Sequence, residues 1–303
     1  MGGAKKLNIW ILNDGRRGHL NQSIALANAI SLKKNSSIYQ IDISSTLKTI
    51  NLLLKRRFIA TSKLNKPDLI ICTGHKTHLS ALAARSIFGG KIILIMSPTL
   101  PLYLFDHALI PLHDNAPIKK NVSRFEGALS QITPKLNNKS NTVLIIIGGS
   151  SRFFEVDPSE LSQKIRLIIG ETIETEIHIT DSPRTPEEVR TMLSSNFKTL
   201  YKPWESFKIG SVQRLMSSAK TIWVTEDSIS MTYDALSTGS PVGIIPIQRI
   251  RESKVSQVID KLLQKRHATH LSTWSVTHTL NYSPMLNEAS RCADIILRAF
   301  RYR

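Results

Sequence analysis

The chain has 303 residues, of which 41% are hydrophobic and 6% aromatic, and its formal net charge at pH 7 is +17. This apolar content excludes a disordered chain, and the length suffices for two domains of ordinary size. The apolar runs are too short for a membrane-spanning helix or a signal peptide, and the two cysteines, Cys72 and Cys292, have no metal-ligand companions, as is typical of a reduced, cytosolic protein.

Short apolar runs alternate with amphipathic stretches along the whole chain. Continuous Ile, Val and Leu runs are typical of strands buried on both faces, and the repeated order strand, helix, strand predicts parallel sheets in an α/β fold. The expected strands are 7–12, 38–42, 68–73, 91–96, 107–111, 143–148, 175–179, 198–201, 221–225 and 241–246. The expected helices are 20–32, 46–58, 76–88, 158–170, 185–194, 211–219, 228–238, 253–265 and 286–301.

The polar, turn-rich stretch 133–142 separates two such series. It predicts two doubly wound domains, 1–137 and 138–303, and the last helix could pack back on the first domain. Residues 1–140 carry 20 Lys and Arg against 6 Asp and Glu, whereas residues 141–303 carry 20 against 17. A basic first half attracts anionic lipid head groups, phosphorylated glycolipids or nucleic acid, or serves only solubility. Nucleic acid is the weakest of these partners, because no nucleic-acid motif is present.

In open α/β sheets, ligands bind at the carboxyl ends of the strands. The loop "NDGRRGH", 13–19, follows the first expected strand and contains Asp14 and His19. A histidine at the mouth of the next helix can serve as a general base, with Asp14 orienting it or acting as the base itself. The alternative is a surface or helix-capping histidine.

Two further groups in the first half have weaker signals. His75 and His78 form the one close histidine pair, a spacing that does not favour a metal site. Pro111, His113 and Asp114 could line a cleft, but we favour a structural role at the end of the last strand of this domain.

The second half offers two candidate phosphate sites. "GGSSR", 148–152, follows a buried strand; its glycines allow close approach of a phosphate, its serines offer donors and Arg152 offers a guanidinium fork. It has neither the Walker nor the dinucleotide spacing, and a tight turn is the alternative. Asp227, Ser228 and Ser230 cluster at a helix N-terminus, which suits a diphosphate, although the first two could simply cap that helix. Asp234, about two turns further on, could accept hydrogen bonds from ribose hydroxyls.

These segments together resemble one family. "WILNDGRRGHLNQSIALANAI" resembles its signature W-x-L-x-D-G-x-x-G-H-x-x-Q, and "VTEDSISMTYDALSTGSPV" resembles T-x-D-S-x-S-M-x-x-E-A-x-x-T-G-x-P-V. "MSPTLPLYLFDHALIPLHD", "EGALSQIT", "IGGSSR" and "SPRTP" match further blocks in the same order over nearly the whole chain. The family is the mitochondrial fission "elongated mitochondria" family, whose bacterial members are regarded as glycosyltransferases, some of them tied to lipooligosaccharide core assembly.

The resemblance implies a GT-B fold, in which two Rossmann-like domains face a cleft and the second holds a nucleotide-sugar donor. A looser analogy with the lipid-linked N-acetylglucosaminyl transferase of peptidoglycan synthesis implies His19 near the acceptor hydroxyl. The implied catalytic residues are His19 and Asp14. The implied donor-binding residues are Gly148, Gly149, Ser150, Ser151, Arg152, Arg184, Asp227, Ser228, Ser230, Met231 and Asp234, and the acceptor-binding residues are Gly15, Arg16, Arg17, Gly18, Gln22 and Pro98.

The chain departs from the family pattern in two places. Asp234 stands where the family shows Glu, and Arg249 and Arg251 occupy a loop that is often more neutral in relatives. The two arginines suggest a more anionic donor or acceptor.

The expected function is transfer of a sugar from a nucleotide-activated donor to an anionic, membrane-associated glycolipid, without metal or cofactor. The expected location is the cytoplasm, peripheral on the inner face of the inner membrane. A sugar epimerase is also compatible with this fold. The main alternative is a non-catalytic, membrane-associated adaptor, because plant members of the family are linked to recruiting the fission machinery to mitochondria.

Overall fold

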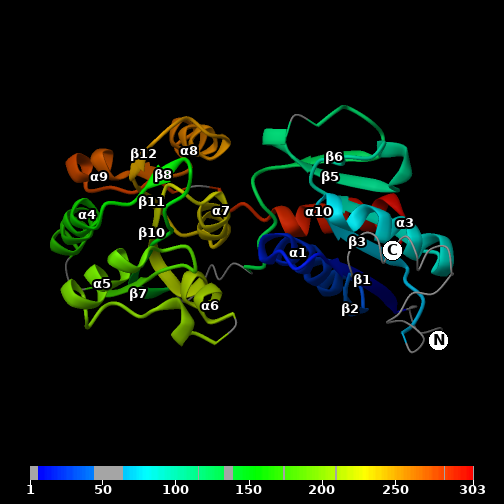
Figure 1. Cartoon of the computed structure of the whole chain (residues 1–303), viewed down its shortest axis with the longest axis horizontal. Helices are drawn as coiled ribbons and strands as arrows, with labels where there is room; N and C mark the ends of the chain where they lie inside the picture. The colour runs from blue at the N-terminus through cyan, green and yellow to red at the C-terminus, as the bar shows by residue number, and fades with distance from the viewer. Residues whose placement is uncertain are drawn as a thin grey trace. The chain divides into compact units, whose positions relative to one another are not determined.

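A computed structural model describes residues 6–43, 64–114, 116–132, 139–172, 175–208, 210–282 and 284–302. The chain divides into two compact units (Figure 1). The first comprises Met1–Gln131 together with Asn287–Arg303, and the second comprises Ile132–Leu286. The division therefore falls six residues before the expected boundary at 137, and the last helix belongs to the first unit.

The first unit is built on a six-stranded parallel sheet with the strand order β2-β1-β3-β4-β5-β6. Its strands are β1 (Leu7–Asn13), β2 (Ser36–Asp42), β3 (Leu69–Thr73), β4 (Lys91–Ile95), β5 (His107–Pro111) and β6 (Val122–Phe125). Its helices are α1 (Arg17–Lys33), α3 (His78–Phe88) and α10 (Glu288–Ala299). Every residue of β3 and β5 is buried, as expected for central strands covered on both faces.

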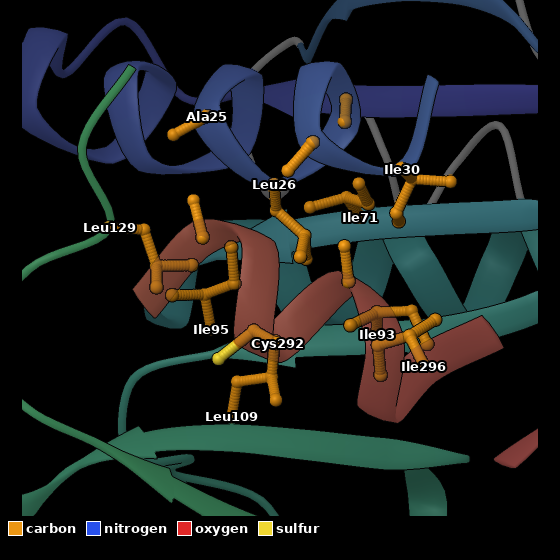
Figure 2. Packing of buried hydrophobic residues seen from close by; sticks show 14 of the residues in the cluster. Ala25, Leu26, Ile30, Ile71, Ile93, Ile95, Leu109, Leu129, Cys292 and Ile296 are labelled. Atoms are coloured by element: carbon orange, nitrogen blue, oxygen red, sulfur yellow. The ribbon is translucent and has the colours of Figure 1, made fainter. Parts of the chain in front are cut away.

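Helix α10 completes the core of the first unit. Figure 2 shows Cys292 and Ile296 of α10 packed among Leu26 of α1, Ile93 of β4 and Leu109 of β5. All five side chains are buried. The last helix is thus part of the hydrophobic core that the N-terminal strands begin.

The second unit has a five-stranded parallel sheet, β13-β11-β10-β7-β9, and a separate antiparallel pair, β12-β8. The strands are β7 (Ser140–Ile146), β8 (Phe154–Glu155), β9 (Glu176–Thr180), β10 (Ala219–Thr225), β11 (Val242–Ile245), β12 (Gln248–Arg249) and β13 (Thr269–His270). The helices are α4 (Pro158–Gly170), α5 (Glu187–Asn196), α6 (Ser211–Ser218), α7 (Ile229–Ser237), α8 (Lys254–Gln264) and α9 (Leu271–Thr277). Asp157 caps α4, since its Oδ1 accepts from the Glu160 N–H, and Pro158 opens the helix.

Most expected elements are confirmed within about three residues, but one strand is wrong. The stretch 198–201 forms a turn, because the N–H groups of Leu200 and Tyr201 both donate to the carbonyl of Phe197. Only an isolated bridge from Tyr201 to Ile179 remains of the expected pairing. The strands β6, β8, β12 and β13 and the helix α9 were not expected, and the helix expected over 46–58 lies outside the described residues. Within the described ranges, no helix combines the length and apolarity needed to cross a bilayer.

Candidate functional site

Each parallel sheet has a switch point, where successive connections leave in opposite directions. In the first unit the chain passes from β1 to β2 on one side and then to β3 on the other. In the second unit it passes from β7 to β9 and then back to β10 on the opposite side of β7. In open α/β sheets, ligands bind beyond the carboxyl ends of the strands at such points. A ligand is therefore expected at the loops after β1 and β3 and at those after β7 and β10.

At the switch point of the first unit, Asp14 and His19 form a hydrogen-bonded pair. The Nδ1 atom of His19 lies 2.9 Å from Oδ2 of Asp14, whose side chain is only 1% exposed. The other carboxylate oxygen accepts from the Arg16 N–H, so the loop itself fixes the acid. Because Nδ1–H donates to the carboxylate, Nε2 of the neutral ring is left as the proton acceptor. This is the arrangement of an oriented general base.

The loop after β3 completes this pair. A Cβ atom added to Gly74 would lie 2.3 Å from Cε1 of His19, so the ring packs directly on the glycine backbone. Gly74 has a φ of +79°, a conformation that favours glycine. Beside it, the hydroxyls of Ser23 and Thr73 are 2.7 Å apart and tie α1 to the end of β3. The sequence placed Gly74 at a strand end but did not connect it with His19.

The other residues assigned to the acceptor lie in the same loop, in α1 and in the loop after β4. Gly15, Arg16, Arg17 and Gly18 are exposed in the loop and the first turn of α1. Gln22 follows one turn after His19 on the same helix, and its Oε1 is buried without a hydrogen-bond partner. Pro98 is half-buried in the loop after β4.

His78 is a core histidine. Its ring is 1% exposed and packs edge-on against Phe105, and Nδ1 lies 3.3 Å from Oγ1 of Thr99. Burial, with a smaller contribution from the charge of His75, lowers its pKa from 6.5 to about 4. His75 itself is exposed. One member of the close histidine pair is therefore exposed and the other is buried.

Pro111 ends β5, and His113 and Asp114 follow in a short 3-10 turn. Nε2 of His113 lies 4.0 Å from Oδ1 of Asp114. Both side chains are partly buried at the end of the strand.

At the switch point of the second unit, Asp227 joins three loops. Its side chain is fully buried, and its carboxylate accepts from Oγ1 of Thr225 at 2.6 Å, from the Gly149 N–H at 3.0 Å and from Nη2 of Arg184 at 3.0 Å. The Thr225 hydroxyl in turn accepts from the Gly148 N–H at 2.7 Å. The buried carboxylate therefore supports these loops, and both of its oxygens accept from protein donors. The sequence assigned Asp227 to donor binding, and the structure shows it in this supporting position.

The two glycines are required by close packing in this network. A Cβ atom on Gly148 would lie 2.2 Å from the Asp227 carboxylate, and one on Gly149 would lie 1.9 Å from the carbonyl oxygen of Arg184. Thr185 adds a further tie, because its hydroxyl donates to the carbonyl of Gly148 at 2.5 Å. The loop after β7 is thereby held in one conformation.

The remaining residues assigned to the donor divide between support and surface. Ser228 caps α7, with its hydroxyl accepting from the Met231 N–H at 3.4 Å, whereas Ser230 is exposed in the first turn and Asp234 is half-buried. The hydroxyl oxygens of Ser150 and Ser151 accept from nearby N–H groups of the same loop. The residues that present polar groups to solvent are Ser150, Ser151, Arg152, Arg184 and Ser230.

Arg249 does not support the interpretation that its loop binds an anionic substrate. Its guanidinium donates to Oε2 of Glu226 at 2.7 and 2.9 Å and forms two further bonds to the carboxylate of Asp260. Both carboxylates raise the pKa of Arg249. The arginine therefore serves as an internal clasp between the end of β10 and α8.

Asp181, at the end of β9, was not singled out from the sequence. Its side chain is fully buried; Oδ1 accepts from the Trp204 N–H at 2.8 Å, and Oδ2 lies 3.0 Å from Nε of Arg190. Burial is the largest influence on its carboxyl group and raises its pKa. A lone acid two residues after the expected strand 175–179 was the one available signal.

With this geometry established, comparison with known proteins assigns a family. The family model described as Mitochondrial fission ELM1 matches residues 17–300. The chain belongs to this family. The resemblance noted in the sequence is thereby confirmed. The uncharacterised protein RP120 of Rickettsia prowazekii (strain Madrid E) is 28% identical over 97% of this chain and 99% of its own length.

Solved structures similar to this ELM1-family chain show its fold. The Acinetobacter baumannii MurG structure has a TM-score of 0.50 at 14% identity, covering 96% of this chain and 99% of that one. The UDP-GlcNAc 2-epimerase of Neisseria meningitidis, bound to UDP-GlcNAc, has a TM-score of 0.51 at 12% identity, covering 98% and 100%. At such identities the likeness establishes architecture alone. The expected α/β fold of the GT-B type, with two doubly wound parallel sheets, is confirmed.

Proposed function

We propose that this ELM1-family protein is a glycosyltransferase that moves a sugar from a nucleotide-activated donor to an anionic, membrane-associated glycolipid of the lipopolysaccharide core type. The main support is the second switch point, where the Gly148–Gly149 loop is pinned by Asp227 beside the N-terminus of α7. The first N–H groups of a helix have no partner within it and lie at the positive end of the helix dipole. A pinned glycine loop beside such a helix suits a diphosphate.

The first unit supports the acid–base part of the proposal. In this mechanism Nε2 of His19 takes the proton of the acceptor hydroxyl while Asp14 holds Nδ1–H and stabilises the imidazolium that forms. The acceptor oxygen then bonds to the anomeric carbon as the bond from that carbon to the nucleotide diphosphate breaks. The helix dipole of α7 and the loop donors stabilise the negative charge that collects on the leaving diphosphate. The proposal requires no cofactor or metal ion.

A nucleotide-binding screen tests the donor site. UDP, GDP, ADP, CMP and dTDP are titrated into the purified protein, its Asp234→Ala variant and the matched control Glu187→Ala, which removes an exposed carboxylate from α5 of the same unit. We expect one nucleotide to bind, Asp234→Ala to lose that binding and Glu187→Ala to keep it. Binding of none of them by a folded protein would contradict the donor site and favour the adaptor.

A transfer assay then tests the catalytic residues. With the sugar nucleotide that the screen identifies and a lipooligosaccharide core fraction as acceptor, His19→Ala is expected to abolish transfer and to leave donor binding intact. Retained turnover would remove His19 from the mechanism. Product analysis distinguishes transfer from epimerisation, because an epimerase changes the sugar while it stays on the nucleotide.

The proposed membrane attachment has support in an apolar and basic edge of the first unit. Tyr103 is 81% exposed and Ile118 is 92% exposed, and Lys119 and Lys120 are exposed next to Ile118. Nδ2 of Asn121 donates to the carbonyls of Leu102 and Phe105, both at 3.1 Å, and so holds the two loops together. Apolar side chains beside lysines suit the surface of an anionic bilayer.

Vesicle sedimentation tests this attachment and the peripheral inner-membrane location that it implies. We expect binding to vesicles with anionic lipids, little binding to neutral vesicles, and a clear loss in the double variant Tyr103→Ser with Ile118→Ser. Val276→Ser, which removes a 79% exposed apolar side chain from the second unit, is the matched control. Equal binding to neutral and anionic vesicles would contradict the proposed electrostatic contribution of the lysines to membrane attachment.

A further inference from the structure

Three side chains form a compact cluster on the second unit: Arg152, Phe153 and Arg251. The guanidinium carbon of Arg152 lies 4.6 Å from the centroid of the Phe153 ring, and that of Arg251 lies 5.0 Å from the same centroid. Both arginines are exposed. Each contact is within the range of a cation–π interaction, which orients a guanidinium but does not neutralise it.

Backbone pairing joins the two segments that carry the arginines. β8 pairs with β12 in antiparallel register, and just beyond this pair the Ile250 N–H donates to the carbonyl of Phe153 at 2.9 Å. Nε of Arg251 then donates to the carbonyl of Arg152 at 3.1 Å. The loop after β7 and the loop after β12 are thus tied together, and within the part of the chain that the structure describes the terminal nitrogens of both arginines remain available.

The charges of the cluster have no internal counterpart. Among the described residues, neither Arg152 nor Arg251 is within ion-pair distance of a carboxylate, and the adjacent Glu252 accepts from the hydroxyl of Ser256 at the start of α8. Arg249, two residues before Arg251, shows the contrast, because it is neutralised by Glu226 and Asp260. Both guanidinium groups contact the same ring, so the two like charges repel each other, and a bound anion would relieve that repulsion.

We infer that the Arg152–Phe153–Arg251 cluster is an oxyanion-binding site that receives a phosphate or carboxylate group of the substrate. The inference rests on the proposed function for the identity of that substrate. It adds to the second unit a substrate contact that the Gly148–Gly149 loop does not provide. Paired guanidinium forks recognise phosphate and carboxylate oxygens by charge-assisted hydrogen bonds. The group belongs either to the diphosphate of the donor or to an acidic substituent of the acceptor.

A phosphate titration followed by NMR tests the site without any nucleotide. Inorganic phosphate is added to the whole protein, and the arginine Nε–H resonances are followed in the wild type and in Arg152→Ala, Arg251→Ala and Arg251→Lys. Arg166→Ala is the matched control, because Arg166 is also exposed and lies 5.5 Å from the ring of Phe197.

We expect the Arg152 and Arg251 resonances to shift together in the wild type. Phosphate affinity should fall about tenfold or more in the two alanine variants, as the loss of charge-assisted hydrogen bonds implies, and should stay within about twofold in Arg166→Ala. Arg251→Lys keeps the positive charge but lacks the planar guanidinium group, so its loss of phosphate affinity should lie between these limits. No response of either resonance, or an equal loss in Arg166→Ala, would overturn the inference.

A second titration identifies the source of the group. If the nucleotide found in the binding screen displaces phosphate from the two arginines, the site holds the diphosphate of the donor. If nucleotide and phosphate bind together, the site receives an acidic group of the acceptor. If phosphate binds and no nucleotide does, the proposed donor site fails while the oxyanion site stands.

Discussion

Replacing Gly149 by alanine should break the loop network of the second unit. The new Cβ atom would lie 1.9 Å from the carbonyl oxygen of Arg184 and 2.9 Å from its Cβ. Since Cβ atoms do not approach other heavy atoms closer than 3.0 Å, the two loops must separate by about 1 Å. Such overpacking costs about 1–3 kcal/mol. The shift would also stretch the 3.0 Å bond from the Gly149 N–H to Asp227, and leaving that donor unpaired costs about 1–3 kcal/mol more.

The expected result is a loss of about 2–6 kcal/mol in the free energy of unfolding of the second unit, together with a loss of nucleotide binding. Urea unfolding followed by tryptophan fluorescence measures the first effect, because Trp204, Trp223 and Trp274 lie in the second unit. Gly170→Ala is the matched control: a Cβ at this last residue of α4 meets nothing within 4 Å, so the change should be neutral or stabilising by up to about 1 kcal/mol. If Gly149→Ala unfolded at the same urea concentration as the wild type and kept its nucleotide affinity, the reasoning would be refuted.

Three other changes test the first unit and the clasp after β10. Asp14→Asn keeps the shape of the side chain but removes the charge that orients His19, so kcat should fall about 100-fold or more with little change in KM; an unaltered kcat would exclude a positioning role. Arg249→Lys removes the guanidinium group that donates two hydrogen bonds to the buried Glu226, so the free energy of unfolding should fall by about 1–3 kcal/mol. Unchanged urea unfolding would show that an ammonium group suffices. Because burial lowers the pKa of His78 from 6.5 to about 4, the stability it contributes is present above pH 6.5 and is lost as the pH falls toward 4. A loss of up to about 3 kcal/mol between pH 7 and pH 4 should appear in the wild type and be absent in His78→Gln, as urea unfolding at each pH would show.

The sequence predicts the parallel sheets because central strands are uniformly apolar. β3 and β5 are buried at every position, and such runs are legible without knowledge of their neighbours. The stretch 198–201, Lys-Thr-Leu-Tyr, ends in two large hydrophobic residues, yet the carbonyl of Phe197 accepts the N–H groups of Leu200 and Tyr201 and closes a turn. The two-residue strands β8 and β12 exist only because they pair with each other, a long-range contact that no local pattern encodes.

The candidate site could be predicted as a set of loops but not as a set of contacts. The rule that ligands bind beyond strand ends directs attention to Asp14, His19 and Asp227. It does not say which way a side chain turns, and the Asp227 carboxylate turns inward to support Gly149. Arg249 and Arg251 look alike in the sequence, but the acids that neutralise the first come from elements distant in the chain.

The route of the chain through the two units has a consequence during synthesis. Residues 132–286 form one continuous unit, so a growing polypeptide contains all of the second unit before α10 has been made. The first unit begins earlier but lacks Cys292 and Ile296 from its core until the last residues emerge. Domains tend to fold as units during translation. The second unit is therefore expected to finish folding first, while the apolar side of α1 stays exposed until α10 packs against it.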